Sequence, residues 1–103
     1  NGHYFENYVV MELLKNFSYS PDKVNMTYYR DSNAKEIDVI IEENGSVHPL
    51  EIKKSANPDR REVKKYEVLD KTTLERGSGG IICMCEEVIP IDKKNCFIPC
   101  NLI

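Results

Sequence analysis

The sequence predicts a single α/β domain of the α+β type, with a mixed sheet and the element order α-β-β-β-α-β followed by a short β tail. Three observations favour this fold. An apolar stripe at helical spacing occupies the first 17 residues. Two predicted strands, residues 35–43 and 46–53, are joined by the turn signal Asn44-Gly45. A glycine-rich break at residues 77–80 then precedes an apolar run. The length of 103 residues corresponds to one domain, residues 1–103.

The first half of the chain predicts a helix and three strands. Residues 3–17 carry the helical stripe, residues 24–30 are rich in strand-forming side chains, and residues 35–43 alternate. Asn44-Gly45 is a strong signal for a two-residue hairpin turn, so residues 46–53 return as the third strand. In this register Asp38 faces Glu51, and Glu36 faces Lys53 as an ion pair.

The second half predicts a helix and further strands. Asn57-Pro58 is typical of an N-cap followed by proline at the first helical position, and this helix is expected to end near residue 73. Residues 80–85 predict a buried fourth strand. Residues 89–91 and 97–99 contain proline and are expected to form edge strands, because proline cannot serve a central ladder.

The composition favours a cytoplasmic protein. No apolar run approaches the roughly 20 residues of a membrane span, and the N-terminus lacks the basic and apolar regions of a secretory signal. The abrupt start within a helix suggests a domain from a longer chain. The spacing of the four cysteines allows buried structural thiols, which we favour, a zinc site or disulfides. These cysteines are Cys83, Cys85, Cys96 and Cys100.

The charge is unevenly distributed. The net charge is -3 at pH 7, yet residues 53–76 hold eight basic and five acidic residues. Such a basic segment suits binding to phosphates, although from charge alone we favour an ordinary solvated helix face. The candidate nucleic-acid contacts are Lys54, Arg60, Arg61 and Lys64.

Glu6, Asp38, Glu51 and Lys53 are the candidate site residues. Glu6 falls within the apolar stripe of the first helix, where a carboxylate needs a partner or a metal, although the helix N-terminus also favours it. Asp38 and Glu51, opposite each other on one face, would repel without a bridging cation. Strand alternation places Lys53 on the face of Glu51, where an ammonium can stabilise a charged phosphate. With Lys53 as the only nearby counter-charge, the metal-free site is expected to hold excess negative charge.

These residues lie in stretches that resemble a known family. The stretches that carry the resemblance are Gly2-His3-Tyr4-Phe5-Glu6-Asn7, Tyr28-Tyr29-Arg30-Asp31, Lys35-Glu36-Ile37-Asp38 and Leu50-Glu51-Ile52-Lys53-Lys54-Ser55. The sequence resembles a C-terminal domain of unknown function (the 4143 type) found in bacterial and archaeal AAA-type ATPases. The resemblance covers nearly the whole chain. It implies a restriction-endonuclease-like core of the PD-(D/E)XK superfamily, although Ile37 stands where the motif has proline.

The resemblance also implies residue roles. Asp38, Glu51 and the backbone carbonyl of Ile52 would hold Mg²⁺ or Mn²⁺, Lys53 would assist the attacking water, and Glu6 would act through a second metal or an ordered water. The implied function is a Mg²⁺-dependent endodeoxyribonuclease that acts on DNA and is appended to an N-terminal ATPase domain of the same parent chain. No G-x4-G-K-[ST] motif occurs in this chain. The alternative is a non-catalytic docking or nucleic-acid-binding module that keeps the fold.

Overall fold

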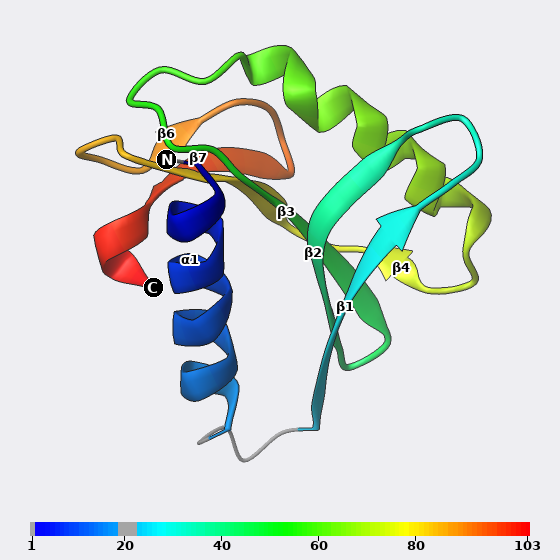
Figure 1. The fold of residues 1–103 in the computed structure, drawn as a ribbon. Helices are drawn as coiled ribbons and strands as arrows, with labels where there is room; N and C mark the ends of the chain where they lie inside the picture. The colour runs from blue at the N-terminus through cyan, green and yellow to red at the C-terminus, as the bar shows by residue number, and fades with distance from the viewer. Residues whose placement is uncertain (1, 19–22) are drawn as a thin grey trace.

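The computed structural model describes residues 2–18 and 23–103, which form a mixed α/β fold. Figure 1 shows an N-terminal helix, a strongly twisted sheet and a second helix above it. The elements are α1 (Gly2–Phe17), β1 (Val24–Arg30), β2 (Glu36–Glu43), β3 (Ser46–Ile52), η1 (Arg60–Lys71), β4 (Glu75–Arg76), β5 (Gly79–Cys83), β6 (Ile89–Pro90), β7 (Asn95–Pro99) and η2 (Cys100–Leu102).

One mixed sheet contains all seven strands of the described residues. The strand order is β1-β2-β3-β5-β7-β6, and β4 pairs with the start of β3. The β1–β2, β2–β3 and β6–β7 pairs are antiparallel, whereas β3–β4, β3–β5 and β5–β7 are parallel. The predicted α/β class and mixed sheet are therefore confirmed.

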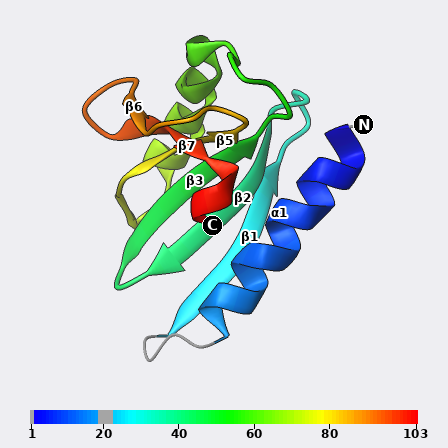
Figure 2. The same cartoon turned by 90° about the vertical axis from the view of Figure 1, so that its left-hand side faces the viewer.

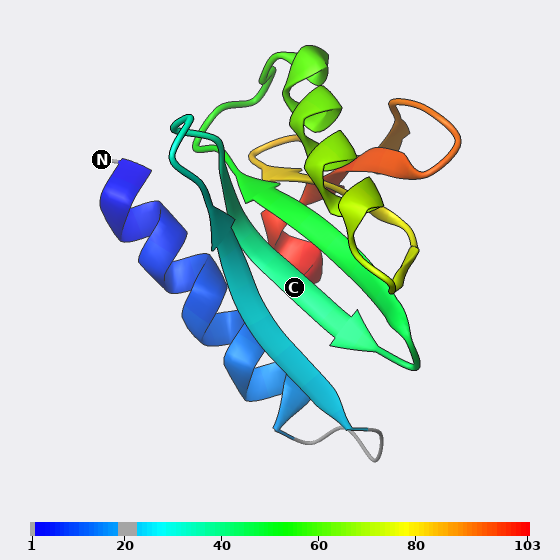
Figure 3. The same ribbon diagram turned by 90° about the vertical axis from the view of Figure 1, so that its right-hand side faces the viewer.

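Two apolar cores lie on opposite faces of the sheet. Figure 3 shows the sheet between α1 and η1, and Figure 2 shows η2 on the same side as α1. On the α1 face, Val9 and Leu13 pack against alternate residues of β2 and β3. On the η1 face, Tyr66 and Leu69 pack against residues of the same strands and of β5. Burial of these side chains is the main favourable term in folding.

The hairpin register agrees with the sequence prediction over most of its length. The turn residues Asn44 and Gly45 have positive φ angles of 53° and 80°, as a tight hairpin turn requires. The ladder runs from Glu43–Ser46 to Val39–Leu50. It ends there, so the extrapolated opposite pairs Asp38–Glu51 and Glu36–Lys53 are not ladder pairs.

A bulge explains why the ladder stops. Between the β1–β2 pairs Thr27–Ile40 and Tyr29–Ile37, β1 advances two residues and β2 advances three. The extra residue of β2 is therefore Asp38 or Val39. A bulge breaks the alternation of side chains and re-aims one of them, which a sequence pattern of period two cannot reveal.

The second helix differs from the prediction in type and start. It is a 3₁₀ helix, and its N-cap is Asp59, not Asn57, because the Asp59 carboxylate accepts the hydrogen bond from the Arg61 amide. Its buried residues are Val63, Tyr66, Val68 and Leu69, and three of them, Val63, Tyr66 and Leu69, recur every three positions. This spacing keeps one face on the sheet in a helix of three residues per turn.

The prolines are placed differently from the expectation for edge strands. β6 is an edge strand, but β7 lies between β5 and β6, with Pro99 at its last position. Pro49 lies inside the central strand β3, after the two residues paired with β4 and before those paired with β5. Neither parallel ladder therefore includes Pro49, so its missing N–H is tolerated there.

The cysteines are free thiols in the structure. Cys83 is buried within the core on the η1 face, and Cys85 packs against that core. Burial raises the pKa of the Cys83 thiol to about 11. Among the described residues, no helix is both long and apolar enough to cross a membrane.

Candidate functional site

Asp38 and Glu51 link the two strands where their ladder ends. The Ile52 amide donates to the Asp38 carboxylate over 2.9 Å, and the Asp38 amide donates to Glu51 Oε1 over 3.3 Å. Each carboxylate thus binds a backbone amide of the opposite strand. Ile52, the third residue expected to hold a metal, is buried at the end of β3.

Glu51 is buried and paired with an ammonium group from η1. Its side chain is 3% exposed, and its Oε2 contacts Lys65 Nζ directly. Lys65 also lies 3.3 Å from Glu62, and Glu62 lies 3.9 Å from Lys53. Acidic and basic groups therefore alternate along Glu51, Lys65, Glu62 and Lys53. The contacts of both Glu51 and Lys53 with η1 agree with their predicted placement on one face of β3.

Two electrostatic expectations are wrong. Lys53 is not the only nearby counter-charge, because Lys65 contacts Glu51. The predicted Glu36–Lys53 ion pair does not form either. Glu36 instead pairs with Arg30 over 3.2 Å across the β1–β2 ladder, since the hairpin ladder does not extend to Glu36.

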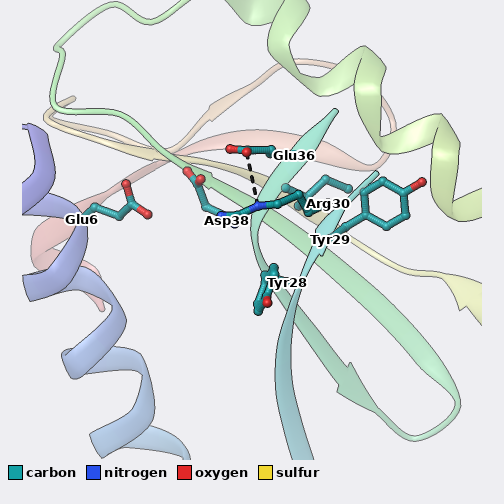
Figure 4. A pocket seen from close by; sticks show the side chains of 7 residues that line it. Glu6, Tyr28, Tyr29, Arg30, Glu36 and Asp38 are labelled. Atoms are coloured by element: carbon teal, nitrogen blue, oxygen red, sulfur yellow. Dashed lines mark ion pairs between the residues drawn. The ribbon is translucent and has the colours of Figure 1, made fainter. Parts of the chain in front are cut away.

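Glu6 and Asp38 meet on the α1 side of the sheet. Both line a cavity of about 270 Å³, and Figure 4 shows the Glu6 carboxylate directed toward Asp38. Partial burial raises the pKa of Glu6, and the charge of Asp38 raises it further. Glu6 therefore retains a proton to higher pH than an isolated glutamate.

Residues of β1 form another wall of this cavity. Tyr28, Tyr29 and Arg30 line it together with Glu36. The Arg30 guanidinium lies 5.5 Å from the centre of the Tyr28 ring, within range of a cation–π interaction. The cavity therefore combines carboxylates with an exposed aromatic side chain.

The donor chemistry of the site suits a hard cation, but its present geometry is not that of an assembled metal centre. Carboxylate and carbonyl oxygens are the ligands that Mg²⁺ prefers. Within residues 2–18 and 23–103, no group of three or more His, Cys, Asp or Glu side chains is arranged to hold a metal. Asp38 and Glu51 instead bind amides and Lys65. A cation would have to displace some of these partners.

The candidate nucleic-acid contacts are spread over η1 and the loop before it. Arg61 is paired with Asp59 over 2.8 Å, and Arg60 donates to the Ile91 carbonyl. Lys54 and Lys64 are exposed. All four side chains are exposed, and the two arginines also have partners within the domain.

Tyr66 belongs to the core. Its hydroxyl donates to the Gly80 carbonyl over 2.7 Å, and burial raises its pKa. Arg76 lies 5.3 Å from the centre of its ring. Tyr66 thus fixes η1 against β5 and thereby positions Lys65.

Lys65 and Glu62 are the site residues that sequence reasoning missed. Both lie in the basic segment, where charge alone does not distinguish them from solvated neighbours. The signal lies in the three-residue spacing of Val63, Tyr66 and Leu69. Once that spacing fixes the face of η1 on the sheet, it places Glu62 and Lys65 on the adjoining face.

The fold and site define a mixed α/β domain with a carboxylate-rich cavity beside a bulged hairpin. A family model described as "Domain of unknown function (DUF4143)" matches residues 1–103, and the chain belongs to this family. No curated protein and no solved structure matches the chain.

Proposed function

We propose that this domain is a metal-dependent nuclease-like module of the PD-(D/E)XK type that hydrolyses phosphodiester bonds of DNA and is appended to an AAA-type ATPase. One observation carries the proposal. Asp38 and Glu51 are joined at the ladder end by mutual side chain–amide bonds of 2.9 and 3.3 Å. Glu6 adjoins Asp38 on the α1 side of the sheet, whereas Glu51 and Lys53 contact η1 on the other side.

Each residue has a role in this reaction. Asp38, Glu51 and the Ile52 carbonyl would hold Mg²⁺ or Mn²⁺, which supplies Lewis-acid stabilisation of the phosphate when bound. Lys53 would direct its ammonium at the charge that develops on the attacked phosphate. Glu6, whose pKa is raised, would orient the attacking water and accept its proton.

A non-catalytic docking or nucleic-acid-binding module is the second candidate. The Glu51–Lys65 contact and the amide bonds to both carboxylates favour it. These bonds satisfy the buried oxygens without a cation, as expected of structural hydrogen-bond partners. The two candidates differ in their response to metal.

Cleavage of DNA by the domain, alone and within its parent chain, separates the candidates. We expect nicking of supercoiled DNA with Mg²⁺ or Mn²⁺ and none with EDTA. Lys53→Ala should reduce the rate by at least about 100-fold, as expected for loss of a group that stabilises transition-state charge. Exposed Lys93, on the loop before β7, supplies the matched control Lys93→Ala.

The control variant should cleave at the wild-type rate, and circular dichroism should show that both variants are folded. Equal residual cleavage by wild type and Lys53→Ala would mean that the activity does not come from this site. A melting temperature that no divalent metal raises, together with absent cleavage, would favour the non-catalytic module.

A further inference from the structure

We propose that Lys65 is a positioning residue that competes with a divalent cation for Glu51. In the metal-free domain its ammonium compensates the buried carboxylate, and a bound cation displaces it. The inference rests on the proposed function, because it concerns the cation which that function requires.

Burial makes a partner for Glu51 necessary. Its side chain is 3% exposed, and the Lys65 side chain is 23% exposed. A buried carboxylate without a partner is strongly unfavourable. Lys65 is the cation in direct contact with Glu51, so any metal ion at Glu51 must replace this ammonium or share the carboxylate with it.

The structure offers Lys65 a second partner. Glu62 lies 3.3 Å from Lys65 Nζ and 3.9 Å from Lys53 Nζ. When a cation occupies Glu51, the flexible side chain of Lys65 can move toward Glu62 without losing its counter-ion.

Competition has a measurable consequence. Removal of the Lys65 charge should strengthen metal binding, because the cation no longer displaces an ammonium. The same removal should destabilise the metal-free domain, because Glu51 is left buried and unpaired. A purely structural lysine would give the second effect without the first.

The experiment measures Mn²⁺ binding by isothermal titration calorimetry and melting temperature in EDTA. For Lys65→Met we expect a dissociation constant at least tenfold lower than that of wild type. We also expect a lower melting temperature in EDTA that saturating Mn²⁺ largely restores. Lys71→Met, an exposed position at the end of η1, makes the same chemical change away from Glu51 and should alter neither quantity.

Lys65→Gln keeps a hydrogen-bond donor near Glu51 and tests the charge alone if Lys65→Met fails to fold. It should tighten Mn²⁺ binding in the same direction. Equal or weaker binding by the folded variants, with a wild type that binds Mn²⁺, would overturn the inference and leave the proposed function standing. If neither wild type nor folded variants bind Mn²⁺, the metal-dependent function itself fails.

Discussion

At the scale of single residues, Asp38 combines a structural contact with a place in the site. Its carboxylate accepts the Ile52 amide just beyond the last ladder pair of the hairpin. The same residue lines the cavity with Glu6. A carboxylate that replaces a ladder bond is held in a fixed orientation, which suits a group meant to bind a ligand.

The raised pKa of Glu6 leads to a pH-dependent prediction. A carboxyl whose folded-state pKa is raised destabilises the fold when it ionises. This penalty is absent below the unfolded pKa, about 4.3, and complete above the folded pKa. Glu6→Gln should therefore stabilise the metal-free domain at pH 7, by less than about 1 kcal/mol because solvent screens a partly exposed group.

Thermal melts in EDTA at pH 7 and pH 4 test this prediction. The gain from Glu6→Gln should shrink as the pH falls toward 4. Glu12 is half-buried on the same helix, away from the cavity that Glu6 lines, so Glu12→Gln measures the effect of removing a charge from α1 in general. An equal gain in both variants, or a gain that persists at pH 4, would contradict the role of the Glu6 environment.

The sequence selected the candidate residues but did not identify their partners. Glu6, Asp38, Glu51 and Lys53 follow from periodicity and hairpin register, which are local properties. Lys65 contacts Glu51 from another element, and that contact depends on how η1 packs. A linear pattern carries no direct information about which lysine of a basic segment faces inward.

At the scale of elements, most strands were predictable, whereas the short strand β4, the inner position of β7 and the irregularities were not. Asn44-Gly45 set the register because a two-residue turn allows only one alignment of the strands. The bulge in β2 adds one residue without any marker in the composition. The apolar residues of η1 are compatible with either helix type, so the 3₁₀ geometry could not be inferred from the sequence.

Close contact between β5 and β7 leads to a prediction about Gly80. A Cβ atom at this position would overlap the backbone carbonyl of Cys96 on the paired strand. Because backbone cannot yield as a flexible side chain can, Gly80→Ala should destabilise the domain by about 2 kcal/mol or more. Urea denaturation measures this loss.

Gly2→Ala is the matched control, because a Cβ atom there meets no heavy atom within 4 Å. That variant should be neutral or slightly stabilising, since alanine favours helix. An unchanged urea midpoint for Gly80→Ala would show that β7 can shift away from β5 at little cost.

At the scale of the whole molecule, the central strand β3 and the helix α1 are held in place by different interactions. β3 pairs with β2, β4 and β5 through backbone hydrogen bonds. The buried side chains that hold α1 on the sheet are those of Val9 and Leu13. Elements held mainly by a few buried side chains open at lower free energy than central strands.

Amide hydrogen exchange should therefore be slower in the central strands than in α1. Amides of β3 and β5 should exchange only through global unfolding, whereas amides of α1 should exchange through a local opening that requires less free energy. Val9→Ala should accelerate exchange throughout α1 more than in β5. Uniform protection of α1 and β5, changed equally by Val9→Ala, would show a single cooperative unit.

The hairpin register has a consequence for the order of events during folding. Asp38 and Glu51 belong to one hairpin, whose local contacts form with a small loss of chain entropy. Lys65 reaches Glu51 only after η1 packs on the sheet. Because η1 lies between β3 and β5 in the sequence, the parallel pairing of these strands closes a loop that contains the whole helix. We therefore expect a growing chain to bring its two acidic groups together before their ammonium partner arrives. For that interval the hairpin carries uncompensated charge that water, not protein, must solvate.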